Sequence, residues 1–71
     1  MKNQPFIDAF GKNLRKLREE RGMSQEALAN EAGVAFSQIG RIERGVRSPT
    51  LSTIASLAKG LGVEPKKLLD F

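Results

Sequence analysis

The segment from Gln25 to Ile42 obeys spacing rules that few folds impose together. Counted from Gln25, the fifth residue is small, the ninth is glycine, and the tenth, fifteenth and eighteenth are branched aliphatics. These residues are Ala29, Gly33, Val34, Ile39 and Ile42. A small fifth residue lets two helices cross closely, a ninth glycine supplies the positive φ of a tight turn, and the branched residues face a core. The pattern predicts two short helices joined by a turn, over residues 24–45.

Apolar residues recur at spacings of three and four on both sides of this pair, as amphipathic helices require. They predict one helix from about Phe6 to Arg21 and another over residues 51–61, each followed by a glycine, and a last helical turn carrying Leu68 and Leu69. No stretch alternates with period two, so no strand is expected. Because 71 residues are too few for a second core, we predict one all-α domain of five helices over residues 1–71.

The residue types argue against catalysis. The chain has no cysteine and no histidine, so it lacks a thiolate, an imidazole base and the commonest metal ligands. It also lacks a glycine-rich phosphate loop, and the neighbouring acids Glu19 and Glu20 point apart on a helix. We predict no enzyme activity, no metal and no cofactor. Because the start Met1–Pro5 lacks the order of a signal peptide and no apolar run could span a bilayer, we predict a cytoplasmic protein.

The charge distribution favours an anionic partner. Twelve Lys and Arg face eight Asp and Glu, a formal net charge of +4 at pH 7. Arg41, Arg44 and Arg47 follow one another closely, with Glu43 as the one acid among them. A cluster of this kind is typical of a nucleic-acid-binding face.

Taken together, the chain resembles the phage repressor/Cro family, also called the Xre family, of helix-turn-helix regulators. The matching residues run from Leu17 and Arg18 through Gly22–Ala29, Gly33, Val34, Ile39, Ile42–Gly45 and Arg47–Pro49, and continue through Ala58 and Gly62 to Leu68 and Leu69. The resemblance implies a compact lambda-repressor-like fold that binds double-stranded DNA. The recognition helix, over residues 36–44, would lie in the major groove.

The resemblance also assigns roles to particular residues. Those that match base-contacting positions are Ala35, Phe36, Ser37 and Arg41. Those that match phosphate-contacting positions are Gln25, Arg44, Arg47, Ser48 and Thr50. Arg41 fits its role best, because a guanidinium can pair with guanine O6 and N7. Arg18 and Glu43 match positions that the family commonly joins in a partly buried ion pair.

Two residues depart from the common pattern of the family. Ala35 stands where a serine or threonine usually caps the recognition helix, a loss of about 1 kcal/mol. Gly40 stands where a side chain that faces DNA is frequent, and glycine is unfavourable inside a helix. Two explanations are open: the recognition helix frays in the free protein, or Gly40 lets DNA approach the backbone. We favour the first.

A single recognition helix reads few base pairs, so we predict a homodimer on a pseudo-palindromic operator with half-sites about 34 Å apart. The last helix and the C-terminus, with Leu69 and Phe71, would lie near the dimer interface. The competing function is a protein-binding module, which the arginines near Arg41 disfavour. The sequence leaves open a phage repressor, a restriction-modification controller or an antitoxin, with a toxin or RNA polymerase as partner, and it does not give the operator.

Overall fold

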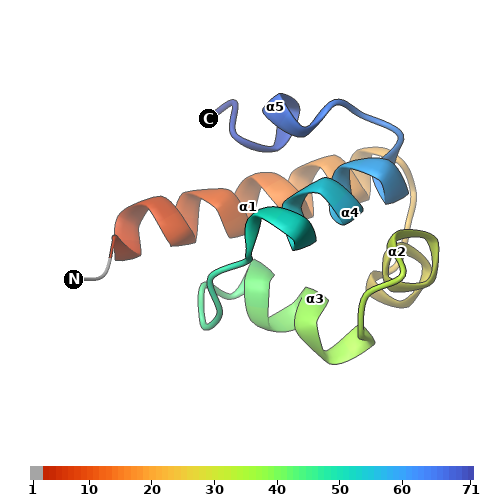
Figure 1. Cartoon of the computed structure of the whole chain (residues 1–71), viewed down its shortest axis with the longest axis horizontal. Coiled ribbons are helices and arrows are strands. Elements are labelled where there is room, and N and C mark those ends of the chain that lie inside the picture. Colours follow the sequence, from red (N-terminus) through yellow and green to blue (C-terminus); the bar gives the residue numbers. More distant parts are fainter. Residues whose placement is uncertain (1–2) are drawn as a thin grey trace.

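Five α-helices make up the computed structural model, which describes residues 3–71 (Figure 1). They are α1 (Gln4–Glu20), α2 (Gln25–Ala32), α3 (Phe36–Glu43), α4 (Leu51–Leu61) and α5 (Pro65–Leu68). No strand occurs in this part of the chain, so the predicted all-α fold of five helices is confirmed. The predicted single domain also includes Met1 and Lys2, which lie outside the described residues.

The helix ends follow from local chemistry. The side chain of Ser24 accepts a hydrogen bond from the backbone N–H of Ala27 at the start of α2, and Thr50 does the same for Thr53 at the start of α4. Each cap satisfies one of the N–H groups that a helix leaves free. Gly33 ends α2 with a φ of 71°, the left-handed conformation that the turn requires. α1 begins at Gln4, two residues earlier than predicted, because a proline in the first turn loses no hydrogen bond.

All five helices contribute to one hydrophobic core. Its members are Phe10, Leu14, Leu17, Leu28, Ala29, Ile39, Ile42, Leu57, Ala58, Leu61 and Leu68. α1 packs against α3 and α5, and α2 packs against α3 and α4. In Figure 1, α3 lies on one side of α1 and α5 on the other. The core therefore fixes the two helices of the turn unit from behind and leaves the outer face of α3 uncovered.

Two glycines inside helices mark places where backbones touch. A Cβ added to Gly11 of α1 would collide with the carbonyl oxygen of Ile42 and would lie 2.8 Å from that of Glu43, at the end of α3. A Cβ added to Gly60 of α4 would lie 2.9 Å from the backbone nitrogen of Ala32, at the end of α2. Gly11 thus lets α1 approach α3 closely, and Gly60 lets α4 approach α2 closely.

The C-terminal segment folds back onto α1. The side-chain amide of Asn13 donates to the carbonyl oxygens of Lys67 and Leu68, both at 3.0 Å. The ring of Phe71 meets that of Phe6 with the centroids 5.1 Å apart and the planes tilted by 57°. The two rings remain 52% and 56% exposed. The contact leaves an aromatic surface facing solvent where the first turns of α1 meet the C-terminal segment.

Candidate DNA interface

The outer face of α3 carries the residues predicted to read bases. Ile39 and Ile42 turn inward and are buried, whereas Phe36, Ser37 and Arg41 are exposed. Ser37 and Arg41 are four residues apart, so they are neighbours along one side of the helix. The structure therefore brings these side chains to one accessible face.

Ala35 occupies the N-cap position of α3 and provides no side-chain hydrogen bond there. Its backbone is extended, and the helix begins at Phe36. Ala35 is exposed beside Phe36, at the end of α3 that follows the turn. The first N–H groups of α3 thus receive no bond from the cap side chain.

The predicted phosphate contacts lie around this face. Arg44, Arg47 and Ser48 are located on the C-cap of α3 and the loop that follows it, and Arg44 and Arg47 carry the positive charge of this region. Thr50 ends that loop, and its hydroxyl accepts from the N–H of Thr53 at 3.1 Å. Gln25 stands apart as the first residue of α2, with its side chain directed toward the end of α3. Positive charge therefore gathers where α3 runs into the loop, and a polar amide flanks it.

Glu43 is the centre of a hydrogen-bonded network. Its Oε2 lies 2.6 Å from Nε of Arg18, and its Oε1 accepts from Nη2 of Arg18 and from Nε2 of Gln25, both at 3.0 Å. Arg18 also donates from Nη1 to the carbonyl oxygen of Met23 at 2.8 Å. The side chains of Arg18 and Glu43 are 10% and 4% exposed. One carboxylate thus connects α1, the start of α2 and the end of α3.

This pairing changes the charge that the interface presents. The hydrogen bond from Arg18 to Glu43 raises the pKa of Arg18, against the opposing effect of burial, so the guanidinium stays charged. The positive charge of Arg18 then neutralises the carboxylate beside Arg44. Glu43 consequently does not cancel the positive charge carried by Arg41, Arg44 and Arg47 on α3 and its loop.

Gly40 lies inside α3 beneath two neighbouring side chains. It is buried, and a Cβ placed on it would lie 2.9 Å from Nη1 of Arg44 and 3.5 Å from Oε1 of Gln25. The side chains of Arg44 and Gln25 therefore lie over Gly40, and they would have to move before DNA could approach its backbone, the explanation not favoured above. α3 runs through Gly40 as a continuous helix.

The loop after α3 is held from a direction that the sequence did not indicate. Nε2 of Gln4 donates to the carbonyl oxygen of Gly45 and to Oδ1 of Asp8, both at 2.8 Å. Gly45 has a φ of 74°, and a Cβ added to it would collide with Oδ1 of Asp8. The start of α1 thus anchors the loop that carries Arg47. Gln4 and Gly45 are 41 residues apart, so no pattern among neighbouring residues predicts their contact.

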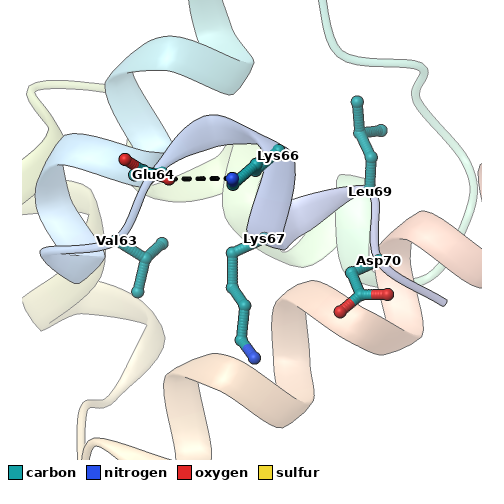
Figure 2. A pocket seen from close by; sticks show the side chains of 6 residues that line it. All are labelled: Val63, Glu64, Lys66, Lys67, Leu69 and Asp70. Carbon is teal, nitrogen blue, oxygen red and sulfur yellow. Dashed lines mark ion pairs between the residues drawn. The ribbon is translucent and has the colours of Figure 1, made fainter.

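The hollow shown in Figure 2, about 500 Å³ in volume, lies at the other end of the molecule. It is lined by Val63, Glu64, Lys66, Lys67, Leu69 and Asp70. The Lys66–Glu64 pair drawn there is 3.5 Å long, and both side chains are largely exposed. α5 lies across α1 from α3 (Figure 1), so this hollow takes no part in the candidate interface.

The described residues 3–71 contain no group of three or more acidic side chains that could hold a metal ion. In the same part of the chain, no helix has the length and apolar character needed to cross a membrane.

Comparison with known proteins gives consistent matches. A helix-turn-helix family model matches residues 14–68. The control protein C.BamHI of Bacillus amyloliquefaciens is 46% identical over 63 residues, which cover 87% of this chain and 78% of that protein. The phage CTXphi transcriptional repressor RstR of Vibrio cholerae is 40% identical over 61 residues, covering 86% of this chain and 55% of the repressor.

Solved structures agree with the sequence matches. The restriction-modification controller protein C.AhdI of Aeromonas hydrophila superposes with a TM-score of 0.85 at 44% identity. The match covers 87% of this chain and 94% of the controller.

Proposed function

Because the chain belongs to the helix-turn-helix family of DNA-binding transcriptional regulators, we propose that it reads a specific operator with α3 in the major groove. Membership of this family also means that the chain is a regulator and not an enzyme. The proposal depends above all on the outer face of α3, where Ser37 and Arg41 lie side by side and exposed. A helix with a buried inner side and an accessible polar outer side fits the width of the major groove.

The proposed contacts divide into two classes. Ala35, Phe36, Ser37 and Arg41 contact base edges, with Arg41 pairing with guanine and Phe36 touching a thymine methyl group. The phosphate contacts come from Gln25, Arg44, Arg47, Ser48 and Thr50. Base contacts carry sequence information, and phosphate contacts fix the position of the protein on the duplex.

Selection from random double-stranded DNA tests the proposal, and two variants separate the classes of contact. We expect Arg41→Ala to weaken binding by about 1–3 kcal/mol on the preferred site and to relax the choice of one base pair. We expect Gln25→Ala to weaken all sequences by a similar factor, because a phosphate contact is the same for every base. Affinities measured on the selected site and on single-base variants of it show whether each substitution changes base preference or weakens every sequence equally.

Each variant is compared with wild type at several salt concentrations. Gln25 is uncharged, so Gln25→Ala should leave the salt slope unchanged, whereas Arg44→Ala, which removes a charged phosphate contact, should reduce the slope by about 1. If Arg41→Ala and Gln25→Ala lower the affinity of every site by the same factor, the division of roles is wrong. If wild type enriches no sequence from the random pool, operator reading itself is wrong.

The operator follows from the proposed assembly. We propose that two copies pair through the surface formed by Phe6, Leu69 and Phe71. These side chains are 56%, 45% and 52% exposed, and Phe6 and Leu69 also line an apolar groove with Ile54. A second copy would cover this surface and present two α3 helices to successive turns of DNA, so the operator would be pseudo-palindromic.

Substitution of Phe6 tests the dimer. We expect Phe6→Glu to shift the protein toward monomer, because a carboxylate in an apolar interface is costly to desolvate. Phe36→Glu is a matched control, since Phe36 is 57% exposed and lies on the DNA-facing side. Light scattering across micromolar concentrations gives the mass of each. Equal masses for wild type and both variants would contradict the proposed surface, and a monomeric wild type on DNA would contradict the dimer.

The biological role that we propose is control of restriction-modification genes. Its support is the identity of 46% to the control protein C.BamHI and of 44% to the controller C.AhdI. The phage repressor RstR, at 40%, supports the alternative of a phage repressor. The antitoxin role, a toxin or RNA polymerase as partner and the cytoplasmic location stay predictions.

A further inference from the structure

We infer that Gly40 is a binding determinant. By having no side chain, it lets the guanidinium of Arg44 fold back over α3 beside the amide of Gln25, so that the two act as one phosphate-binding pair. The inference rests on the proposed DNA binding and deepens it. It concerns the Gln25–Arg44 pair, meaning these two side chains, both of which lie over Gly40.

The geometry at Gly40 carries the first step. A single point, the position of an added Cβ, is 2.9 Å from Nη1 of Arg44 and 3.5 Å from Oε1 of Gln25. A guanidinium and an amide from two different helices therefore converge over one backbone position. A distance of 2.9 Å is too short for a Cβ, so any side chain at residue 40 would displace Arg44 from this place.

Glu43 sets the orientation of the amide. Its Oε1 accepts from Nε2 of Gln25, so the amide nitrogen faces the carboxylate and the amide oxygen lies on the side of Gly40. Glu43 is itself fixed by two hydrogen bonds from Arg18. Arg18 and Glu43 are therefore positioning residues for the pair as well as structural ones.

The pair suits a phosphate of the DNA backbone. Arg44 has donors arranged in a fixed fork that matches phosphate oxygens, and Nε2 of Gln25 keeps one N–H beyond the bond to Glu43. Gln25 also stands in the first turn of α2, where the helix dipole favours an anion. Glu43 does not repel the phosphate, because Arg18 neutralises it.

This accounts for a residue that is otherwise unfavourable. Glycine weakens the middle of a helix relative to alanine, and the nearest atoms that a Cβ at Gly40 would meet are the ends of two flexible side chains. Stability alone would therefore favour alanine. Glycine at position 40 thus lowers the stability of the fold and, by this inference, raises the affinity for DNA.

The variant Gly40→Ala should change thermal stability and DNA affinity in opposite directions. We expect its midpoint of thermal unfolding to equal or exceed that of wild type, while its Kd for the selected operator rises roughly tenfold, the loss of one charged hydrogen bond. The loss should be similar for all base variants of the site. Lys66→Ala is the control, because it removes one positive charge on α5, away from α3.

A double-mutant cycle then tests whether Gly40→Ala weakens binding through the side chain of Arg44. We expect Gly40→Ala to have little further effect in an Arg44→Ala background, because the side chain through which it acts is already absent. The same tenfold loss in both backgrounds would mean that DNA contacts Gly40 directly and would overturn the inference. Unchanged or improved binding by Gly40→Ala, with wild type binding its operator, would also overturn it while leaving the proposed function intact. If wild type binds no DNA sequence, both fail together.

Discussion

Replacing Arg18 by methionine is expected to lower the free energy of unfolding by about 3 kcal/mol. Methionine retains most of the length of the arginine but leaves the carboxylate of Glu43, which is 4% exposed, with the amide of Gln25 as its one remaining partner in the network. A buried charge without its counter-ion is costly. A chain of this size has a total stability of roughly 4–10 kcal/mol, so the midpoint of thermal unfolding should fall by about 15 °C.

Arg15→Met is the matched control for this variant. Arg15 pairs with Glu19 at 3.1 Å, but their side chains are 64% and 54% exposed, and such surface pairs contribute about 0.5 kcal/mol. Replacing Glu43 by leucine together with Arg18→Met should restore much of the lost stability, because an apolar pair has no charge to desolvate. A loss from Arg18→Met no larger than that from Arg15→Met would show that the ion pair does not stabilise the fold.

Gly11→Ala is expected to lower the free energy of unfolding by about 2 kcal/mol or more. The added Cβ meets the carbonyl oxygens of Ile42 and Glu43, and a backbone cannot yield as a side-chain end can. α1 must therefore move away from α3, although alanine is the better helix former by up to about 1 kcal/mol. Denaturant unfolding measures the change.

Gly40→Ala supplies the comparison, since the same substitution is made inside a helix but meets the ends of flexible side chains. We expect the two variants to differ in sign, with Gly11→Ala destabilised and Gly40→Ala unchanged or stabilised. If Gly11→Ala were as stable as Gly40→Ala, the close crossing of α1 and α3 would be wrong. Both variants replace glycine by alanine inside a helix. Subtracting one change in the free energy of unfolding from the other therefore cancels the contribution of helix propensity.

Most of the fold could be predicted because its signals are local. The turn between α2 and α3 needs a positive φ at one residue, and Gly33 adopts it, just as Ser24 and Thr50 cap the helices that follow them. The apolar spacing of Ile39 and Ile42 fixes the inner side of α3. Each of these features depends on residues within a few positions of one another.

The features that could not be predicted depend on contacts between distant segments. Gln4 bonds to the carbonyl oxygen of Gly45, and the need for glycine at position 11 arises from carbonyl groups on α3. The sequence pattern places Gly40 on the outer face, but the neighbouring side chains that cover it come from the end of α3 and the start of α2. The one signal in the sequence is that Gly11 and Gly40 interrupt helices without ending them.

The contact between Phe6 and Phe71 would link assembly to folding if two copies pair through this surface. The two rings belong to segments far apart in the sequence, so their contact becomes easier to form once other contacts have brought these segments together. It should form last, after α1 and α5 have docked. If this surface is where two copies pair, a chain in which α1 and α5 have not docked cannot dimerise. Only folded monomers would then enter the active dimer.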